Sequence, residues 1–195
     1  MPIATTDEQR AAADALRSWG AGAQPVALAR AQENEPARWR ECWRDLAGLG
    51  LFGVAVPEEL GGFGGTVTDL AVMLEGAAAM LTPGPVLTTA LAGLVLARSA
   101  SPAAQGALGR LADGARPAAV ALESGTILAT ASGDGFVLHG QVGPVLGADA
   151  ESMLVLAARS GERDVWVLLD ATTDGVKLTE ADTADFSRAL ASMQL

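Results

Sequence analysis

The chain has little cysteine, histidine or aromatic content. Its 195 residues include one cysteine, one histidine and no tyrosine, and aromatic residues make up 4% of it. A single thiol, Cys42, excludes a disulfide framework within the chain and a metal site built from several cysteines. A Ser-His-Asp triad would have to use the single imidazole, His139. Half of the residues are hydrophobic, so the chain can bury a core without cross-links and is not a disordered acidic tail.

Basic charge and long apolar runs are also scarce. Lysine and arginine total 13 residues against 23 acidic ones, and the formal net charge is -10. Nucleic acid is therefore not an expected partner, because phosphate binding needs clustered basic residues. The most apolar stretch, residues 77–97, is interrupted by Thr82-Pro83-Gly84-Pro85, and the run that follows this break is too short to cross a bilayer. The first residues show no secretory signal pattern. We expect a cytoplasmic protein that makes no contact with a membrane.

Apolar residues recur at helical spacing up to about residue 112. The clearest stripe, formed by Leu70, Met73, Leu74 and Ala77, predicts a helix. Thr66 or Thr68 is its expected cap, and Thr68 would give no full capping box. Glycine and proline residues separate this helix from its neighbours. The predicted helices run from Asp7 to Trp19, from Pro36 to about Gly48, from Thr66 or Thr68 to Leu81, from Val86 to Val95, and from Pro102 to before Gly114.

After Gly114 the pattern changes to short apolar runs separated by turn residues. The runs cover residues 118–122, 126–131, 136–139, 153–157, 165–169 and 176–178. Short strands at this spacing, with hairpin-type turns and no helices between them, indicate an antiparallel barrel or sandwich. The sequence therefore predicts an α+β protein, with an N-terminal all-helical domain over residues 1–113 and a small antiparallel β-barrel domain over residues 114–195.

Short motifs provide no catalytic set. The segment from Gly48 to Gly53 matches G-x-G-x-x-G, but a dinucleotide site needs a strand before this motif, and here a helix precedes it. Ser124 does not lie in a G-x-S-x-G elbow. His139 is expected near the end of a strand, and Cys42 is expected to be a small buried hydrophobe. The loop carboxylates match no metal-binding spacing. We therefore name no catalytic and no metal-binding residue.

A longer pattern is more specific. Residues 49–65 read Leu-Gly-Leu-Phe-Gly-Val-Ala-Val-Pro-Glu-Glu-Leu-Gly-Gly-Phe-Gly-Gly. This run resembles the L-G-x-x-G-x-x-x-P-E-x-x-G-G-x-G segment of the acyl-CoA dehydrogenase family. Asp69 and Glu75 resemble the family's next helix, and Asp185-Phe186-Ser187-Arg188 resembles its D-x-S-R element. The order of a helical domain followed by a small β domain is also similar.

The resemblance implies an FAD-dependent enzyme that desaturates an acyl-CoA thioester between its α and β carbons. In this family a carboxylate removes the α-proton, the flavin takes the β-hydride, and an electron-transfer flavoprotein accepts the electrons. The resemblance places flavin contacts at Leu122 and Glu123, where the family has Thr-Glu. It places further contacts at Pro144, Val145 and Leu146, which align with an aromatic residue, Ile and a hydroxyl residue.

The sequence departs from the family pattern in three ways. The aromatic residue has become Pro144 and the hydroxyl residue Leu146, so ring stacking and a hydrogen bond to the flavin would be lost. The family's G-S-D loop after Glu123 is missing. The C-terminal helical bundle, which usually carries the catalytic glutamate, is expected to be absent.

The resemblance leaves two alternative functions for the chain, and a third alternative does not depend on it. The chain is either an incomplete or divergent acyl-CoA dehydrogenase that needs a bundle or partner chain, or a non-catalytic, flavin-poor partner subunit. A flavin-poor partner subunit would resemble the divergent subunits of actinobacterial hetero-oligomeric acyl-CoA dehydrogenases that act on steroids. A divergent dehydrogenase could instead form an ordinary homo-oligomer. The third alternative is a β-domain ligand binder that shares only the helical layout.

Overall fold

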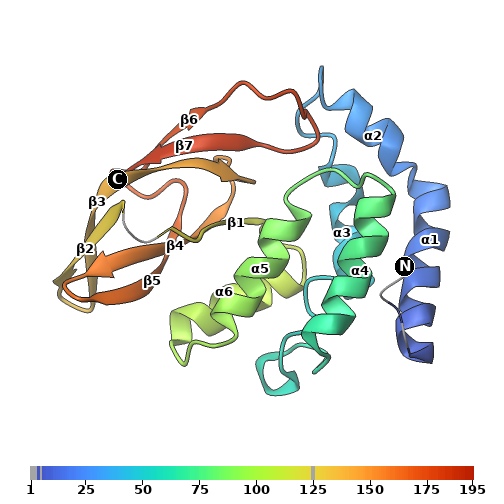
Figure 1. The fold of residues 1–195 in the computed structure, drawn as a ribbon, viewed down its shortest axis with the longest axis horizontal. Helices are drawn as coiled ribbons and strands as arrows, with labels where there is room; N and C mark the ends of the chain where they lie inside the picture. The colour runs from blue at the N-terminus through green and yellow to red at the C-terminus, as the bar shows by residue number, and fades with distance from the viewer. Residues whose placement is uncertain (1–3, 5, 124–125) are drawn as a thin grey trace.

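A computed structural model describes residues 4, 6–123 and 126–195. These residues form six α-helices, one short 3-10 helix and seven strands, and every helix precedes every strand (Figure 1). The predicted α+β class, helices followed by a small curled β-sheet, is confirmed. The helices are α1 (Asp7–Ala23), α2 (Pro25–Ala31), α3 (Arg40–Gly48), η1 (Glu58–Leu60), α4 (Val67–Ala79), α5 (Val86–Leu96) and α6 (Pro102–Ala112). The strands are β1 (Ala118–Ala121), β2 (Ile127–Ser132), β3 (Gly135–Leu146), β4 (Met153–Ser160), β5 (Arg163–Asp170), β6 (Lys177–Glu180) and β7 (Leu190–Gln194).

Side-chain caps determine where α1 and α4 begin. Thr6 Oγ1 accepts the backbone N–H of Gln9 at 3.2 Å, and Gln9 Oε1 accepts the backbone N–H of Thr6. Thr66 and Asp69 form the same reciprocal pair at the start of α4. Thr66, one of the two predicted caps, is therefore the N-cap, and it forms a full capping box because the short Asp69 carboxylate reaches the Thr66 N–H at 2.7 Å. Gln9 also donates to Asp69 Oδ1 at 2.8 Å, so one hydrogen bond joins the two helix starts.

Several elements differ from the sequence prediction. Strand β3 has 12 residues, whereas the predicted apolar run covers only residues 136–139. The sequence pattern does not predict α2, because seven residues are too few to show a helical period. The helix α3 begins at Arg40 instead of Pro36, because residues 36–39 form turns. The pattern also misses β7, whose buried residues are Ala191 and Met193. A small residue alternating with polar ones gives only a weak strand signal.

The sheet is mixed, which the predicted antiparallel barrel did not include. Its strand order is β1-β4-β2-β3-β7-β6, and β5 lies on the other edge of β4. Four pairings, β2–β3, β3–β7, β4–β5 and β6–β7, are antiparallel as expected. The pairing β1–β4 is parallel over four residue pairs, and β2 meets β4 through one parallel pair. A parallel pair needs a long crossover, and the β2–β3 hairpin between β1 and β4 provides it.

Three apolar clusters form the core. One lies among α1, α3 and α4 around Trp39, Trp43 and Phe52. A second fills the inside of the curled sheet. The third contains residues of α5, α6, β1 and β4, among them Leu108 and Val155, so it joins the helices to the sheet. Burial of this shared apolar surface holds the two parts of the chain together.

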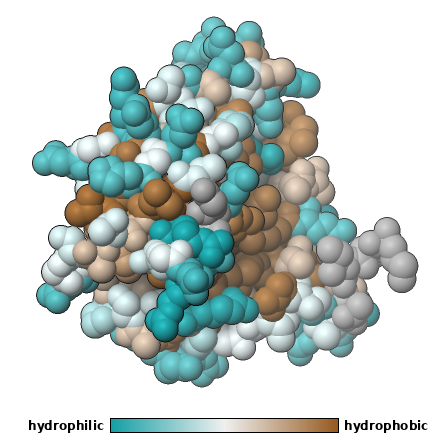
Figure 2. All heavy atoms as spheres, turned by 60° about the vertical axis from the view of Figure 1, so that its left-hand side comes forward, coloured by the Kyte–Doolittle hydropathy of each residue, from teal (hydrophilic) through white to brown (hydrophobic). Residues whose placement is uncertain are grey.

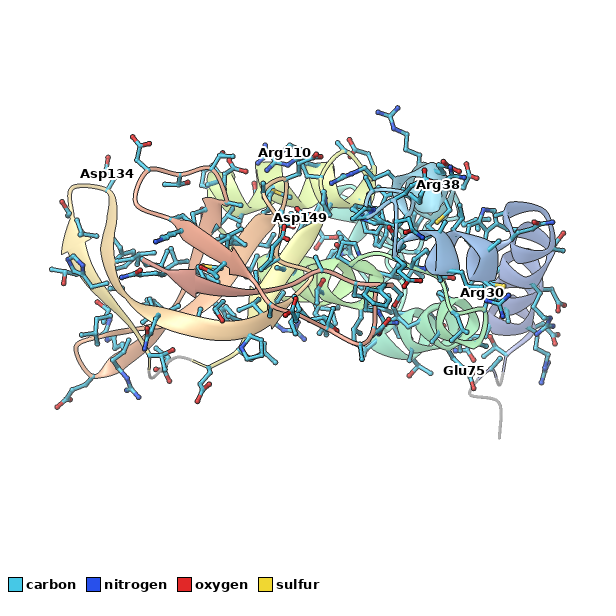
Figure 3. The ribbon with its side chains drawn as sticks, turned by 90° about the horizontal axis from the view of Figure 1, so that it is seen from above. Arg30, Arg38, Glu75, Arg110, Asp134 and Asp149 are labelled. Atoms are coloured by element: carbon cyan, nitrogen blue, oxygen red, sulfur yellow. The ribbon has the colours of Figure 1, made fainter. Side chains whose placement is uncertain are left out.

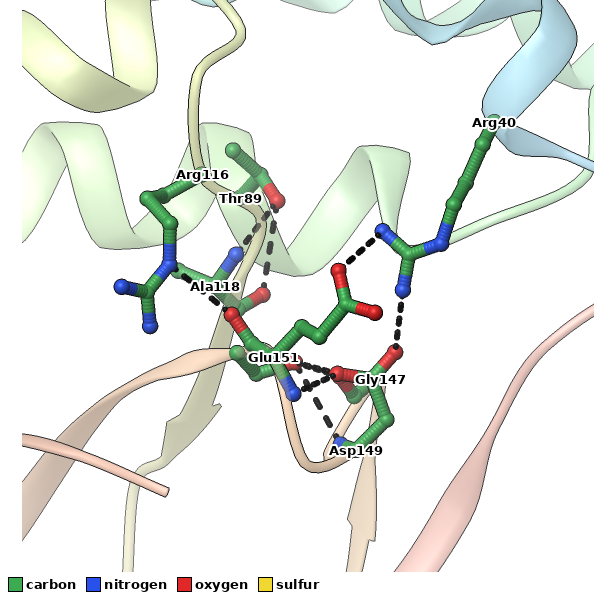
Figure 4. Close-up of polar contacts among 8 residues, drawn as sticks. Arg40, Thr89, Arg116, Ala118, Gly147, Asp149 and Glu151 are labelled. Atoms are coloured by element: carbon green, nitrogen blue, oxygen red, sulfur yellow. Dashed lines mark hydrogen bonds and ion pairs between the residues drawn. The ribbon is translucent and has the colours of Figure 1, made fainter. Parts of the chain in front are cut away.

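Polar contacts reinforce the same junction (Figure 4). Arg40 of α3 reaches Glu151 at 3.0 Å and Asp149 at 3.5 Å, both in the loop before β4. Thr89 of α5 accepts the backbone N–H of Ala118 at 2.9 Å, which satisfies a buried donor at the start of β1. Arg116 donates to the carbonyl oxygen of Glu151 at 3.0 Å. The loop before β4 is therefore tied to α3 and to the segment that precedes β1.

Apolar side chains also reach the surface. None of the helices in the described ranges is long and apolar enough to span a membrane. Large apolar residues are nevertheless exposed, among them Phe63, Val67, Leu81, Leu87, Leu122, Leu128 and Phe186. Figure 2 shows hydrophobic side chains gathered in a hollowed band on one face, between more polar margins. Contiguous apolar surface of this kind commonly marks contact with a ligand or another chain.

Candidate functional site

A polar hollow of about 420 Å³ opens where β3, β7 and β6 lie side by side. Its lining combines the segment after β1 with residues of these three strands, namely Glu123, Thr126, Gln141, Val142, Gly143, Lys177, Thr179, Ser192, Met193 and Gln194. The strand register places Gln141 opposite Gln194, and Gln194 opposite Lys177. Two amides and one ammonium group thus form a row across the sheet. Such groups bind carbonyl, hydroxyl or phosphate oxygens, because they supply several N–H donors.

A bulge in β3 shapes one wall of this hollow. The register between β3 and β7 shifts between Val142 and Val145, and the Gly143–Pro144 peptide is cis. Gly143 has φ +152°, and a Cβ there would lie 2.6 Å from Ser192 Cα. Only glycine allows the two backbones to approach so closely. The bulge also shifts the alternation of inward and outward side chains along β3, so the Val145 side chain lies in the core.

The five predicted cofactor contacts are only partly brought together. Glu123 lines the hollow, and Leu122 precedes it with 67% of its surface exposed. Pro144 is exposed on the bulge. Val145, in contrast, is 3% exposed inside the β-domain core, and Leu146 is half-buried. Glu123 therefore lines the same hollow as residues 141–143 of β3, which immediately precede the predicted contact Pro144.

Sequence reasoning missed most of the polar lining. Gln141, Lys177, Ser192 and Gln194 belong to three strands that are far apart in the sequence. The available signal was the polar alternation in β7, where Ser192 and Gln194 flank the buried Met193. Without knowledge of which strands pair, that alternation cannot be assigned to a shared site.

The glycine-rich segment after α3 packs against its own chain. Gly62 and Gly65 donate backbone N–H groups to the carbonyl oxygens of Pro57 at 3.0 Å and Val54 at 2.8 Å. A Cβ on Gly62 would lie 2.2 Å from the carbonyl oxygen of Val56. The segment therefore needs glycine for close backbone approach, and the G-x-G-x-x-G match within it forms a helix stop followed by turns.

The D-x-S-R element joins the sheet to the helices. Asp185 Oδ1 accepts the backbone N–H of Ser187 at 2.9 Å. Hydrogen bonding from Ser187 lowers the pKa of the Asp185 carboxyl. The Ser187 carbonyl oxygen in turn accepts the backbone N–H of Gly84 at 2.8 Å, in the turn between α4 and α5. This element positions the chain before β7 and has no contact with the polar hollow.

The remaining candidates show no catalytic arrangement. Cys42 is buried, its thiol donates to the Trp39 carbonyl oxygen at 3.2 Å, and burial raises its pKa to about 11. A thiol in that state is a poor nucleophile. His139 is exposed on β3, with Leu128 as its cross-strand partner. Ser124 lies outside the described residues. Among the described residues no group of three or more His, Cys, Asp or Glu side chains could hold a metal ion.

Comparison with known proteins identifies the family. The family model described as "Acyl-CoA dehydrogenase, N-terminal domain" matches residues 6–115, more than half of the chain. This chain belongs to the acyl-CoA dehydrogenase family. Acyl-CoA dehydrogenase FadE34 of Mycobacterium tuberculosis is 39% identical over 208 residues, which cover 100% of this chain and 27% of that protein.

Solved acyl-CoA dehydrogenase structures share the fold. The ChsE4-ChsE5 complex of Mycobacterium tuberculosis contains a chain with a TM-score of 0.85 and 26% identity, matched over 100% of this chain and 55% of that one. A variant of the Tcur3481-Tcur3483 steroid ACAD gives a TM-score of 0.82 and 28% identity, over 96% and 54%. The chain thus spans about a quarter of FadE34 and about half of these acyl-CoA dehydrogenase chains.

The residues at the predicted flavin positions fit a flavin ring poorly. Leu122, Pro144 and Leu146 carry neither a polar side-chain atom nor an aromatic ring. Pro144 also has no backbone N–H, and Val145 and Leu146 lie in the ladder with β7. A protein tunes a flavin through hydrogen bonds to the ring and groups packed against it. In this acyl-CoA dehydrogenase chain the polar side chains of the hollow instead share a lining with Gly143, the residue before Pro144.

Proposed function

We propose that this chain is a flavin-poor subunit of a hetero-oligomeric acyl-CoA dehydrogenase, and that a partner chain supplies most contacts to the flavin ring. The observation that carries the proposal is the chemistry at Leu122, Pro144 and Leu146, whose side chains offer the ring neither a hydrogen-bond donor nor an aromatic stacking surface. The helical core and the junction with the sheet are, in contrast, fully formed. Structural similarity to a chain of the ChsE4-ChsE5 complex supports an assembly of unlike chains.

The reaction proposed for the assembly is the desaturation of an acyl-CoA thioester in the cytoplasm. FAD would supply the redox chemistry, and an electron-transfer flavoprotein would receive the electrons. This chain would contribute its helical scaffold and the polar hollow. In the hollow, Lys177 supplies the positive charge, and the amides of Gln141 and Gln194 supply donors and acceptors. A steroid-derived acyl group is the proposed substrate class, because the Tcur3481-Tcur3483 relative is named a steroid ACAD.

A second candidate function is an acyl-CoA dehydrogenase chain that holds its own flavin within a homo-oligomer. The observation that favours it is the position of Glu123 in the polar hollow, beside the strand where the family resemblance places the cofactor. Gln141, Lys177 and Ser192 would then replace the missing contacts. This candidate requires one flavin for each copy of the chain.

Flavin stoichiometry distinguishes the two candidates. The chain would be purified alone and after co-expression with acyl-CoA dehydrogenase chains from the same genome, and flavin absorbance would be measured against protein. We expect the chain alone to be colourless, and a complex with its partner to contain one flavin for every two chains. One flavin per copy in a homo-oligomer would overturn the proposal and support the second candidate. Complexes with every tested partner that contain no flavin would contradict both.

A further inference from the structure

A second and larger hollow, with a volume of about 1210 Å³, lies between the β domain and the connection from α5 to α6. Its walls are β5, the first half of β3, the connection from α5 to α6, and the segment before β6. The lining is largely apolar, and Trp166 within it is 49% exposed. None of its residues belongs to the polar hollow at Glu123. Its volume also exceeds the range of about 300–1,000 Å³ typical of small-molecule pockets.

One wall of this hollow is an unpaired strand edge. The β4–β5 hairpin closes with Ser160 opposite Arg163 across a two-residue turn, which makes that pair hydrogen-bonded. The alternation then directs the backbone N–H and C=O groups of Asp164, Trp166 and Leu168 away from β4. In the described part of the chain β5 pairs with β4 alone. Those N–H and C=O groups are therefore available to another strand.

The opposite wall has a second unpaired edge. Ser132 faces Gly135 across the two-residue turn of the β2–β3 hairpin, so Phe136 and Leu138 direct their backbone groups away from β2. The next residue with this orientation, Gly140, exchanges hydrogen bonds with Leu195 at 3.2 and 2.9 Å. The β3–β7 ladder covers only the second half of β3. Phe136 and Leu138 consequently border the hollow without a ladder partner among the described residues.

The two edges have compatible directions. The pairings from β5 through β4 and β2 to β3 are antiparallel, parallel and antiparallel, so β3 and β5 run the same way. A strand antiparallel to β5 is therefore also antiparallel to β3. Antiparallel pairing is the commoner arrangement in sheets. The centre of β5, Val165–Leu169, carries no charge and no proline, the features that normally keep an exposed edge from pairing.

The charges at the rim select the partner. Asp134 and Asp174 both line the hollow, and no ion pair involving either carboxylate is found within the described ranges. The lining also contains one basic side chain, Arg98, whose guanidinium donates to the Leu94 carbonyl oxygen of its own helical turn at 2.7 Å. Figure 3 shows Asp134 at the tip of the β2–β3 hairpin, at the end of the molecule farthest from α1. Two unpaired carboxylates favour a lysine or arginine side chain on whatever enters the hollow.

We propose that this hollow binds an extended segment of a partner polypeptide as an added antiparallel strand on β5, with apolar side chains at alternate positions and a basic residue near Asp134 and Asp174. The backbone edges of β5 and β3 give affinity, the apolar lining selects the side chains, and the two carboxylates fix the direction. This is strand addition to an exposed sheet edge. The site is separate from the polar hollow, so it does not depend on whether this chain binds flavin.

The experiment uses the full chain and a synthetic peptide, acetyl-Lys-Thr-Val-Thr-Val-Thr-Lys-amide. Amide hydrogen exchange followed by NMR reports each backbone group separately. We expect saturating peptide to slow exchange at Trp166 and Leu168 by about tenfold, because each amide gains a hydrogen bond. Peptide N-methylated at alternate residues cannot form the ladder and should give no slowing. Peptide with Glu in place of both Lys should bind about tenfold more weakly.

A matched pair of variants tests the edge itself. Trp166→Pro removes the outward N–H, whereas Trp166→Thr removes the same side chain and keeps that donor. The Pro variant should bind the peptide at least about tenfold more weakly than the Thr variant. Equal binding of the N-methylated and unmodified peptides would overturn the proposal, and this comparison needs no protein variant. Slow exchange at Trp166 in the free monomer would also overturn it. Protection that appears only when the chain self-associates would assign the edge to a second copy, and would overturn it too.

Discussion

At the scale of single residues, glycine determines how closely the backbone segments approach. Gly62 faces the carbonyl oxygen of Val56, and Gly143 faces the backbone of Ser192. The first contact is local, so the glycine-rich motif in the sequence identifies it. The second joins residues about fifty positions apart, and no sequence pattern shows that β3 and β7 meet there. Local contacts could thus be predicted from the sequence, whereas the bulge beside the polar hollow could not.

We expect Gly62→Ala to destabilise the chain by about 2–4 kcal/mol, because a Cβ 2.2 Å from the Val56 carbonyl oxygen forces the backbone to move. Gly106→Ala is the matched control. Gly106 lies within α6 and has nothing within 4 Å of a built Cβ, so the substitution should stabilise by about 0.5–1 kcal/mol. Urea denaturation measures both changes. Equal effects of the two substitutions would contradict the role assigned to Gly62.

Cys42 should resist alkylation in the folded chain. Burial raises the pKa of its thiol to about 11, so little thiolate is present near neutral pH. The folded-state pKa lies above the unfolded value of about 8.5. The associated stability is therefore complete below about pH 8.5 and is lost as the pH rises toward the folded-state value. Iodoacetamide labelling followed by mass spectrometry should be slow in buffer and fast in guanidinium. Fast labelling of the folded chain would show that the thiol is accessible.

At the scale of elements, helices with a strong period and a clear cap were predicted, and weakly patterned elements were not. The stripe of α4 identified that helix from the sequence alone. Its capping partner Asp69 was overlooked, because the usual capping-box residue is Glu or Gln. The elements α2 and β7 were missed because their burial depends on neighbours that the sequence does not identify. Two of the strands lining the polar hollow, β6 and β7, are among the shortest, which explains why most of that lining was missed.

Asp69→Ala should destabilise the chain by about 1 kcal/mol near neutral pH. The carboxylate caps α4 and accepts a hydrogen bond from Gln9 of α1. Hydrogen bonding from Gln9, followed by that from Thr66, lowers the pKa of the Asp69 carboxyl. Its contribution is therefore complete above the ordinary pKa of about 3.9 and is lost as the pH falls through the folded-state value. Denaturation curves of wild type and variant should converge as the pH falls below the folded-state pKa of Asp69.

Asp182→Ala is the control for that experiment. Asp182 is an exposed carboxylate with no hydrogen bond or ion pair identified among the described residues. It should change stability by less than about 0.5 kcal/mol at every pH. If the two variants showed the same pH dependence, the effect would belong to net charge and not to the α4 cap.

At the scale of the whole molecule, the order of helices and strands was enough to predict the fold class. The mixed sheet was not predictable, because β1 and β4 are separated in the sequence by the β2–β3 hairpin and no local pattern shows that they pair. The junction between helices and sheet likewise depends on contacts such as Trp43 Nε1 to the Gly114 carbonyl oxygen at 3.1 Å. Gly114 has φ +71°, and a Cβ there would lie 2.6 Å from Ala47 Cβ, so this junction has a defined geometry.

The ion pairs of Arg40 should couple the helices to the sheet energetically. Arg40 is 34% exposed and reaches Glu151 of the loop before β4 at 3.0 Å. A double-mutant cycle of Arg40→Met and Glu151→Gln should therefore give a coupling free energy of about 0.5–1 kcal/mol. The control pair is Arg17 and Asp14, which lie on one exposed helix face and should couple by less than about 0.5 kcal/mol. Because Arg40 also faces Asp149, high salt should reduce its coupling without abolishing it. Equal coupling in the two cycles would mean that the apolar cluster shared by α5, α6, β1 and β4 holds the two parts together without help from charge.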